Sequence, residues 1–250
     1  MIFDSNAMAQ ILTCDLSTYC GESSCINCER RPLSLLDGMN VHDLAILEED
    51  RSSRNYKAGE VLFHEGEPSK GLFCLHTGKV KITKSGLFDN ALVTALKRPV
   101  DFLGIKALIL DANYDYTATA LEDSIVCLLE KSHFLQVLKT NIELSSKVMR
   151  LLAQELSNAD ERMLNLTQKH MRGRLADALL LLLSEYGTHT DQMTLNIQLK
   201  RADLAAMANM TVANAIRVLS VFAKENLIET NKRQIIIKDL EGLKRVSQLG

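Results

Sequence analysis

The chain has 250 residues, of which 46% are hydrophobic and 24% are charged, and its formal net charge is −2. This composition is sufficient to bury one large core or two smaller ones, and it excludes an intrinsically disordered chain. The sequence does not begin with a basic segment followed by an apolar one, and no stretch approaches the roughly 20 apolar residues that span a bilayer, so we expect a cytoplasmic protein without a membrane partner.

Four of the six cysteines lie near the start of the chain, at Cys14, Cys20, Cys25 and Cys28. Thiols stay reduced in the cytoplasm, so this group indicates metal or redox chemistry rather than disulfide bonds. Thiolates suit Zn(II) or an iron–sulfur cluster, but a structural zinc site usually has two C-x2-C pairs, and here only Cys25 and Cys28 form one. The spacing alone also allows reduced thiols that bind nothing.

Residues 56–129 consist of short apolar and β-branched runs separated by glycines. The glycines are Gly59, Gly66, Gly71, Gly78, Gly86 and Gly104. Short strands at even spacing predict a small antiparallel sandwich or roll, whose last buried strand covers about 125–129.

A long helix is predicted from about Asn141 to Met171, where the sequence has neither proline nor glycine. Its apolar stripe contains Val148, Leu152, Leu156, Ala159, Met163 and Leu166. Periodicity alone fits either a dimer seam or a helix packed on its own roll. The length, about 45 Å for about 30 residues, favours the dimer, because one small roll cannot cover it.

The C-terminal third predicts an apolar helix that ends at Gly187, then two helices joined at Asn209–Met210 and two short strands around the turn at 230–233. Thr211 is a suitable N-cap, and asparagine tolerates the left-handed conformation of a tight turn. Between Lys200 and Gly250 there are nine Lys or Arg and five Asp or Glu, a balance of +4. This pattern predicts a winged helix-turn-helix that binds nucleic acid, although a purely structural helical hairpin is the alternative.

From about Leu44 onward the chain resembles the superfamily of the cyclic-AMP receptor protein and the fumarate and nitrate reduction regulator. The roll segment "KAGEVLFHEGEPSKGLFCLHTGKVKI" and the helix pair "LAAMANMTVANAIRVLSVFAKENLI" carry the resemblance. It implies an α+β fold with four parts: a cysteine-rich arm (1–31), an antiparallel β-roll (32–140), a dimerisation helix (141–171) and a winged helix-turn-helix domain (172–250).

The resemblance also separates the two branches of the superfamily. Tyr116 and Thr117 stand where cyclic-nucleotide members have an Arg pair, so no guanidinium is available to hold a cyclic phosphate, and we do not expect cyclic AMP to bind. The fumarate and nitrate reduction branch holds a [4Fe–4S] cluster with three arm cysteines and one cysteine in the last roll strand, where Cys127 stands here.

The ligand set implied by that branch is Cys20, Cys25, Cys28 and Cys127, with Cys14 as an alternative from the arm. The order of spacings differs, because here the C-x2-C pair comes last in the arm. Cys74, alone in a strand, is interpreted as a small buried hydrophobe.

The predicted DNA contacts come from the second helix of the pair and from the wing. They are Thr211, Ala213, Asn214, Arg217, Lys232 and Arg233. Arg217 can bind guanine O6 and N7 with two hydrogen bonds, whereas Ala213 offers only apolar contact.

The resemblance implies a homodimeric regulator of transcription that senses oxygen or nitric oxide, binds a pseudo-palindromic operator and contacts RNA polymerase. A zinc- or thiol-switched regulator of the same fold is the alternative. A cysteine-dependent redox enzyme is disfavoured because the chain has neither a G-x-G-x-x-G motif nor a P-loop.

Overall fold

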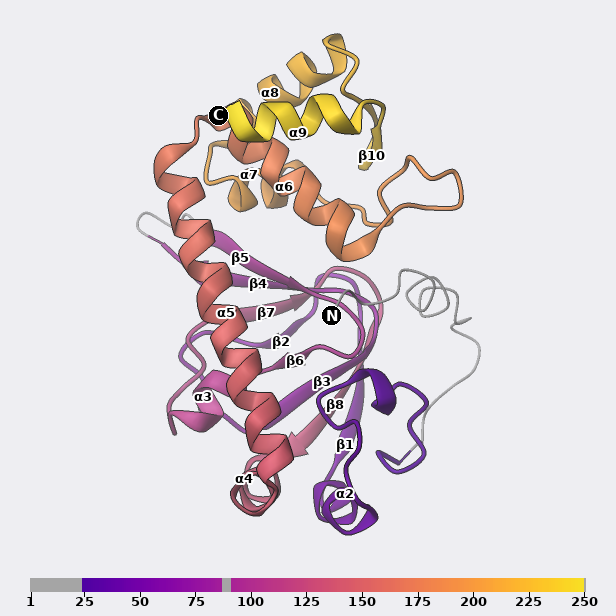
Figure 1. Ribbon diagram of the computed structural model, residues 1–250, viewed down its shortest axis with the longest axis vertical. Helices are drawn as coiled ribbons and strands as arrows, with labels where there is room; N and C mark the ends of the chain where they lie inside the picture. The colour runs from indigo at the N-terminus through magenta and orange to yellow at the C-terminus, as the bar shows by residue number, and fades with distance from the viewer. Residues whose placement is uncertain (1–23, 87–90, 250) are drawn as a thin grey trace.

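The computed structural model describes residues 24–86 and 91–249. Figure 1 shows a β-roll in the lower half and a mainly helical domain above it, with one long helix running beside both. The predicted fold class is confirmed: antiparallel sheets come first, then the long helix, then a helix-turn-helix domain.

The roll consists of two four-stranded sheets in which every strand pair is antiparallel. The first sheet has the order β1 (Ser52–Tyr56), β8 (Ser124–Glu130), β3 (Gly71–Thr77) and β6 (Phe102–Leu103). The second has the order β2 (Val61–Phe63), β7 (Thr117–Ala120), β4 (Val80–Ser85) and β5 (Ala91–Lys97).

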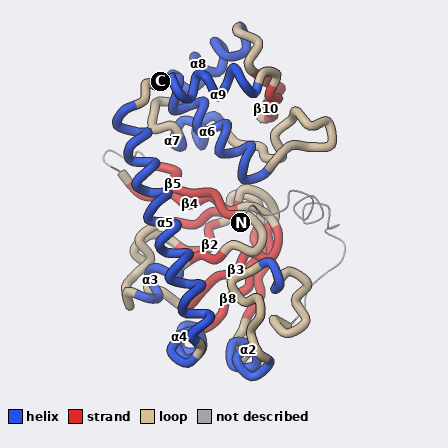
Figure 2. Tube along the Cα trace, in the orientation of Figure 1, coloured by secondary structure: helices blue, strands red, loops and turns tan. Residues whose placement is uncertain are grey.

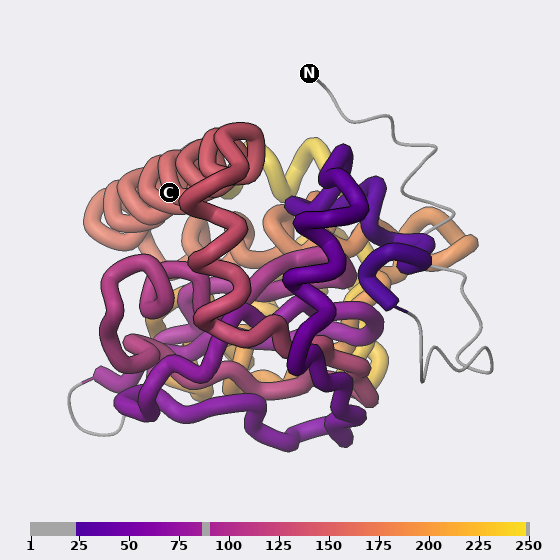
Figure 3. Tube along the Cα trace, turned by 90° about the horizontal axis from the view of Figure 1, so that it is seen from below, coloured from indigo at the N-terminus to yellow at the C-terminus, as the bar shows by residue number. Residues whose placement is uncertain are grey.

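Successive side chains on a strand point to opposite faces of the sheet, and in the first sheet both faces carry apolar side chains. On β3, Phe73 and Leu75 face the roll interior, while Leu72 belongs to a second cluster on the outer face. Short helices accompany that outer face: η1 (Arg31–Leu33), α2 (Val41–Glu48), α3 (Ile105–Ile109) and α4 (Lys131–Thr140). Figure 3, seen from below, shows α2 and α4 side by side there.

The long helix α5 (Ile142–Gln168) lies inside the predicted range of 141–171. The side chain of Asn141 caps it by accepting a hydrogen bond from the Leu144 N–H at 2.8 Å. Leu144 and Val148 are buried in the outer-face cluster, so the first half of α5 belongs to the roll.

The C-terminal domain contains α6 (Met171–Tyr186), α7 (Arg201–Met207), α8 (Val212–Lys224), β9 (Ile228–Asn231), β10 (Gln234–Ile237) and α9 (Leu240–Leu249). Figure 2 shows it as mainly helical, with a small strand region near β10. As predicted, Asn209 has a left-handed backbone, with φ 47°, and Thr211 caps α8. Among the described helices, no single one is long and apolar enough to span a bilayer; only α7 and α8 taken together pass that test, and they are bent by 95°.

One arginine on α5 joins the three parts of the molecule. Arg162 donates hydrogen bonds to the carbonyl oxygens of Thr94 (3.0 Å) and Val93 on β5, and to that of Met207 at the end of α7 (3.1 Å). Nearby, Lys81 of β4 pairs with Asp203 of α7 at 2.5 Å. The C-terminal domain is therefore docked on the edge of the roll.

Replacing Arg162 with methionine is expected to lower the free energy of unfolding by about 2–3 kcal/mol, because three partly buried carbonyls lose a charged donor. Urea unfolding at one fixed protein concentration measures this. The neighbouring exposed substitution Glu161→Gln is the control. A loss at Arg162 as small as that of the control would contradict the joining role.

Candidate functional site

Two cysteines face each other on the outer side of the first roll sheet. Cys74 on β3 and Cys127 on β8 are direct partners in the antiparallel register. Directly opposed side chains in such a pair have Cβ atoms about 4.5–5.5 Å apart. Cys74, interpreted from the sequence as an isolated hydrophobe, therefore lies beside a predicted ligand.

The pair Cys25 and Cys28 lies in the turn that precedes η1. The hydroxyl of Ser24 accepts a hydrogen bond from the Ile26 N–H at 3.0 Å, and the Cys25 N–H donates to the Glu48 carboxylate at the end of α2. Capping of the turn and its attachment to α2 hold the C-x2-C pair over the sheet.

All four of these cysteines line one pocket, which encloses about 510 Å³ including the part open to solvent. Arg30, Arg31, Arg51 and His76 lie in the same wall. The Cys127 thiol has polar neighbours: Arg51 Nη1 lies 3.4 Å from its sulfur, and the Ser53 hydroxyl accepts from it at 3.9 Å.

Burial dominates the acidity of three thiols in the pocket, those of Cys25, Cys74 and Cys127. It raises the pKa of Cys25 to about 12, and nearby Arg51 counteracts only part of this effect. Burial likewise raises the pKa of Cys74 well above its ordinary value and raises that of Cys127. These three thiols are therefore protonated at neutral pH in the metal-free protein, and binding a metal must release their protons.

The residues that line the pocket suit a metal group with thiolate ligands: its cysteines supply sulfur, and its arginines supply positive charge. Thiolates are the ligands of iron–sulfur clusters and of zinc, and no carboxylate is among the lining residues. Arg30, which lines the pocket, has its Nη1 buried without a hydrogen-bond partner among the described residues. In the part of the chain that the structure describes, no three His, Cys, Asp or Glu side chains are in a metal-binding arrangement.

Two other predicted ligands cannot be placed. Cys14 and Cys20 lie outside the described residues, so their part in the site stays a prediction.

The interior of the roll is filled with aromatic side chains. Tyr116 lies 5.4 Å from Phe63, measured between ring centroids, and its hydroxyl accepts a hydrogen bond from the Gly104 N–H at 2.7 Å. Phe63 also stacks on Tyr114, with centroids 4.0 Å apart. Tyr116 is thus a packing residue at the position where cyclic-nucleotide members have an arginine.

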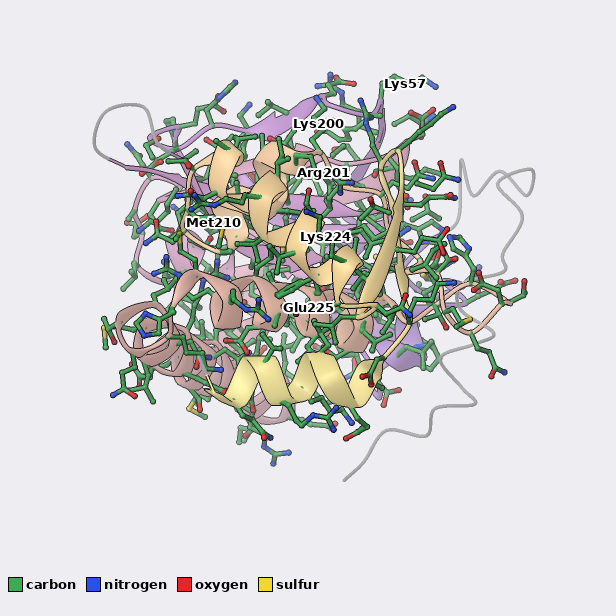
Figure 4. All side chains as sticks on the ribbon, turned by 90° about the horizontal axis from the view of Figure 1, so that it is seen from above. Lys57, Lys200, Arg201, Met210, Lys224 and Glu225 are labelled. Carbon is green, nitrogen blue, oxygen red and sulfur yellow. The ribbon has the colours of Figure 1, made fainter. Side chains whose placement is uncertain are left out.

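The exposed face of α8 carries the predicted base-contacting residues. Thr211, Ala213, Ile216 and Arg217 are exposed, while Asn214 is half-buried and accepts a hydrogen bond from Arg217 Nη2 at 3.0 Å. Figure 4, seen from above, shows α8 running from near Met210 toward Lys224. Ile216 is 48% exposed, so the face that would enter a groove is partly apolar.

The wing is a two-residue turn between β9 and β10. Lys232 and Arg233 form it, both are exposed, and Lys232 has a left-handed backbone with φ 52°. Arg201 Nη2, at the start of α7, donates to the Lys232 carbonyl at 3.0 Å. This hydrogen bond fixes the wing relative to the helix-turn-helix.

The exposed apolar stripe on α5 differs from the predicted dimer seam at one residue, with Met149 in place of Val148. Val148 is 3% exposed and packs in its own roll, so its assignment to the seam is wrong. The large apolar residues that are exposed at intervals of seven along α5 are Ile142, Met149, Leu156 and Met163. The other predicted seam residues, Leu152, Ala159 and Leu166, lie three positions after the last three of these, which gives the a/d pattern of a coiled coil.

Two protein-family profiles match the chain. Residues 53–141 match the cyclic nucleotide-binding domain, and residues 173–246 match the Crp-like helix-turn-helix domain. The first covers most of the roll, and the second covers α6 to α9.

Curated relatives are similar over most of their length. Electron transport regulator A of Shewanella oneidensis is 27% identical over 220 residues, which is 86% of each chain. Transcriptional activator protein anr of Pseudomonas aeruginosa is 26% identical over 225 residues, 87% of this chain and 90% of the relative.

Solved structures share the architecture. FixK2 from Bradyrhizobium japonicum superposes with a TM-score of 0.70 at 21% identity, over 78% of this chain and 96% of that one. A transcriptional regulator of the CRP/FNR family from Thermus thermophilus gives a TM-score of 0.67 at 25% identity, over 79% of this chain and 98% of that one.

Proposed function

The chain belongs to the CRP/FNR family of transcription regulators, and from that premise we propose that it is a homodimer whose binding to operator DNA depends on an iron–sulfur cluster held on the outer face of the roll. When bound, a [4Fe–4S] cluster would supply an iron centre that oxygen or nitric oxide can attack.

The observation that carries the proposal is that Cys25, Cys28 and Cys127 line one pocket with Arg30 and Arg51. A cluster with four thiolate ligands is negatively charged, and guanidinium groups stabilise such an anion. These three cysteines are assigned as ligands. The fourth is expected from the remaining cysteines, with Cys20 and then Cys14 favoured by the family resemblance.

The pocket is coupled to the dimer helix by shared packing. Cys25 and Cys74 pack against the same outer-face cluster that buries Leu144 and Val148 of α5. A movement of the turn at 24–30 on binding the cluster would therefore change the surface on which α5 lies. Oxygen or nitric oxide would reverse that movement, which is how a signal at the pocket would reach the seam.

Cyclic AMP is not part of the proposal. The position of Tyr116 in the aromatic interior, hydrogen-bonded to Gly104, supports its exclusion, because a cyclic phosphate needs charged donors there.

On DNA, the two copies of α8 would enter successive major grooves of a pseudo-palindrome, about 34 Å apart. The proposed partners also include RNA polymerase, since a relative is named a transcriptional activator. We assign these activities to the cytoplasm, where the operator is.

Arg217 is expected to determine one base pair in each half-site. Arg217→Ala should cost about 1–3 kcal/mol at the preferred base and relax the preference there. Lys232→Ala, in the wing, should weaken binding to all sequences about equally, since a lysine at a phosphate reads no base. Titration of fluorescent duplexes that differ at single positions measures both, and a uniform loss for Arg217→Ala would contradict direct readout.

The proposal as a whole is tested with anaerobically purified protein. Visible absorption and about four iron and four sulfide per chain are expected, together with tight binding to a duplex selected from a random library. Exposure to air should remove the absorption and the tight binding together. Colourless protein that contains zinc would instead support a zinc- or thiol-switched regulator.

A further inference from the structure

We infer that Ile216, flanked by Val212 and Ala213, reads thymine methyl groups in the major groove, so that each operator half-site carries a thymine beside the guanine contacted by Arg217. The inference deepens the proposed function. It rests on the binding of α8 to DNA and does not depend on the group bound in the thiol pocket.

The exposed face of α8 is apolar over its first turns. Val212 is 43% exposed and Ile216 is 48% exposed, and Ala213, also exposed, lies on the same face because it is three residues before Ile216. On the opposite face, Val218 and Phe222 belong to the core of the C-terminal domain. Among the described residues, Ile216 is neither in that core nor packed against it, so it adds no packing to the free domain.

Two hydroxyl groups near this face are already engaged within the helix. The Thr211 hydroxyl accepts a hydrogen bond from the Asn214 N–H at 3.2 Å, and Ser220 donates its hydroxyl proton to the Ile216 carbonyl at 3.0 Å. Arg217 gives one N–H to Asn214 and keeps its other donors. To a groove, α8 therefore presents one guanidinium with an apolar patch beside it.

The apolar patch lies in a basic part of the surface. Lys200 before α7, Lys224 at the end of α8, and Lys232 and Arg233 in the wing are all exposed. Figure 4 looks onto the end of the molecule that carries α8, with Lys200 and Lys224 labelled. A DNA duplex matches this combination, because two rows of phosphates flank a major groove in which thymine presents a methyl group.

The chemistry of the bases selects thymine. In the major groove guanine and adenine present hydrogen-bond acceptors, and cytosine presents an amino donor, which an isoleucine would cover without replacing the lost water. Only thymine presents an apolar group there, so its contact with Ile216 removes two apolar surfaces from water at once. Since Ile216 directly precedes Arg217 on the helix, the thymine is expected beside the guanine.

The test removes the methyl group alone. Each thymine of the duplex selected from a random library is replaced in turn by deoxyuridine, which pairs with adenine in the same way but lacks the methyl. We expect one position in each half-site at which the replacement weakens binding about 4-fold, and about 15-fold when both half-sites are changed. Fluorescence anisotropy with the anaerobic full-length chain measures the affinities.

Ile216→Ala identifies the residue responsible. This variant should bind the thymine and deoxyuridine duplexes equally at that position, and it keeps the domain core because Ile216 is exposed. Leu181→Ala is the control, since Leu181 is 38% exposed on α6 of the same domain and should leave the discrimination unchanged. Equal binding of all duplexes by the unaltered chain, or discrimination that persists in Ile216→Ala, would overturn the inference.

The same titrations separate this inference from the proposed function. Binding of the selected duplex that persists without iron would overturn the iron–sulfur proposal, and the deoxyuridine series would still decide the role of Ile216. A chain that binds no duplex selectively would overturn both.

Discussion

Cys127→Ser is expected to abolish the cluster and to lower anaerobic affinity for the selected operator at least about 100-fold, toward non-specific binding. A serine hydroxyl is a poor ligand for iron beside a thiolate, and its size is close to that of the cysteine it replaces. The roll should therefore stay folded while the metal and the specific DNA binding are lost. Iron and sulfide assays with anaerobic fluorescence anisotropy measure the two losses.

Ser53→Ala is the matched control for Cys127→Ser. Ser53 is the partner of Cys127 on β1 and accepts its hydrogen bond, so the change alters the same surroundings without removing a sulfur. We expect the control to keep its cluster and its operator. A Cys127→Ser protein that retains stoichiometric iron would show that the cluster, if present, is held elsewhere.

Leu156→Glu is expected to convert the protein to a monomer at micromolar concentration. Leu156 is 64% exposed in the single chain, at the middle of the stripe that recurs every seven residues. In a symmetric seam two such carboxylates would face each other in an apolar contact. Like charges placed in this way cost several kcal/mol, which corresponds to at least about a 100-fold weaker dimer. Sedimentation velocity over a concentration series measures it.

Leu164→Glu is the control for the seam. Leu164 is 51% exposed on the same helix but lies one position beyond the stripe, next to Met163. The same charge there should leave the dimer intact. If both variants dimerise like the unaltered chain, α5 is not the interface; if both are monomers, the contact is broader than a coiled-coil seam.

The helix-turn-helix was predictable from the sequence because its determinants are local. A left-handed asparagine at Asn209 and a hydroxyl cap at Thr211 act within a few residues, so their chemistry is visible in the letters. Arg217 was predicted from the family resemblance, and the structure places it on the exposed side of the same helix.

The thiol site was only half predictable, because its geometry depends on strand register. Nothing local to Cys74 shows that it will lie opposite Cys127, since pairing is decided by the whole roll. One signal was available: on β3 it shares a face with His76, a polar residue that pointed to something other than a uniformly apolar surface.

The predicted dimer seam differs from the exposed stripe at one residue, Val148, for a different reason. Intervals of three and four along a helix fit two adjacent stripes, and α5 has both: Val148 faces the roll and Met149 faces outward. The outward stripe is distinguished from the roll-facing stripe only by its strict interval of seven, from Ile142 to Met163. The hydrophobicity of the residues alone does not distinguish the two stripes.

The docking of the C-terminal domain also protects the roll from unwanted association. β5 is the last strand of its sheet, and Thr94 is an extra residue there, because Val93 pairs with Thr83 and Ala95 pairs with Ile82. An uncovered terminal strand is a template for pairing with other chains. Here α7 packs on β5 and Arg162 occupies two of its carbonyls. Any state in which the C-terminal domain swings away would uncover that strand and free its two carbonyls to pair with another chain.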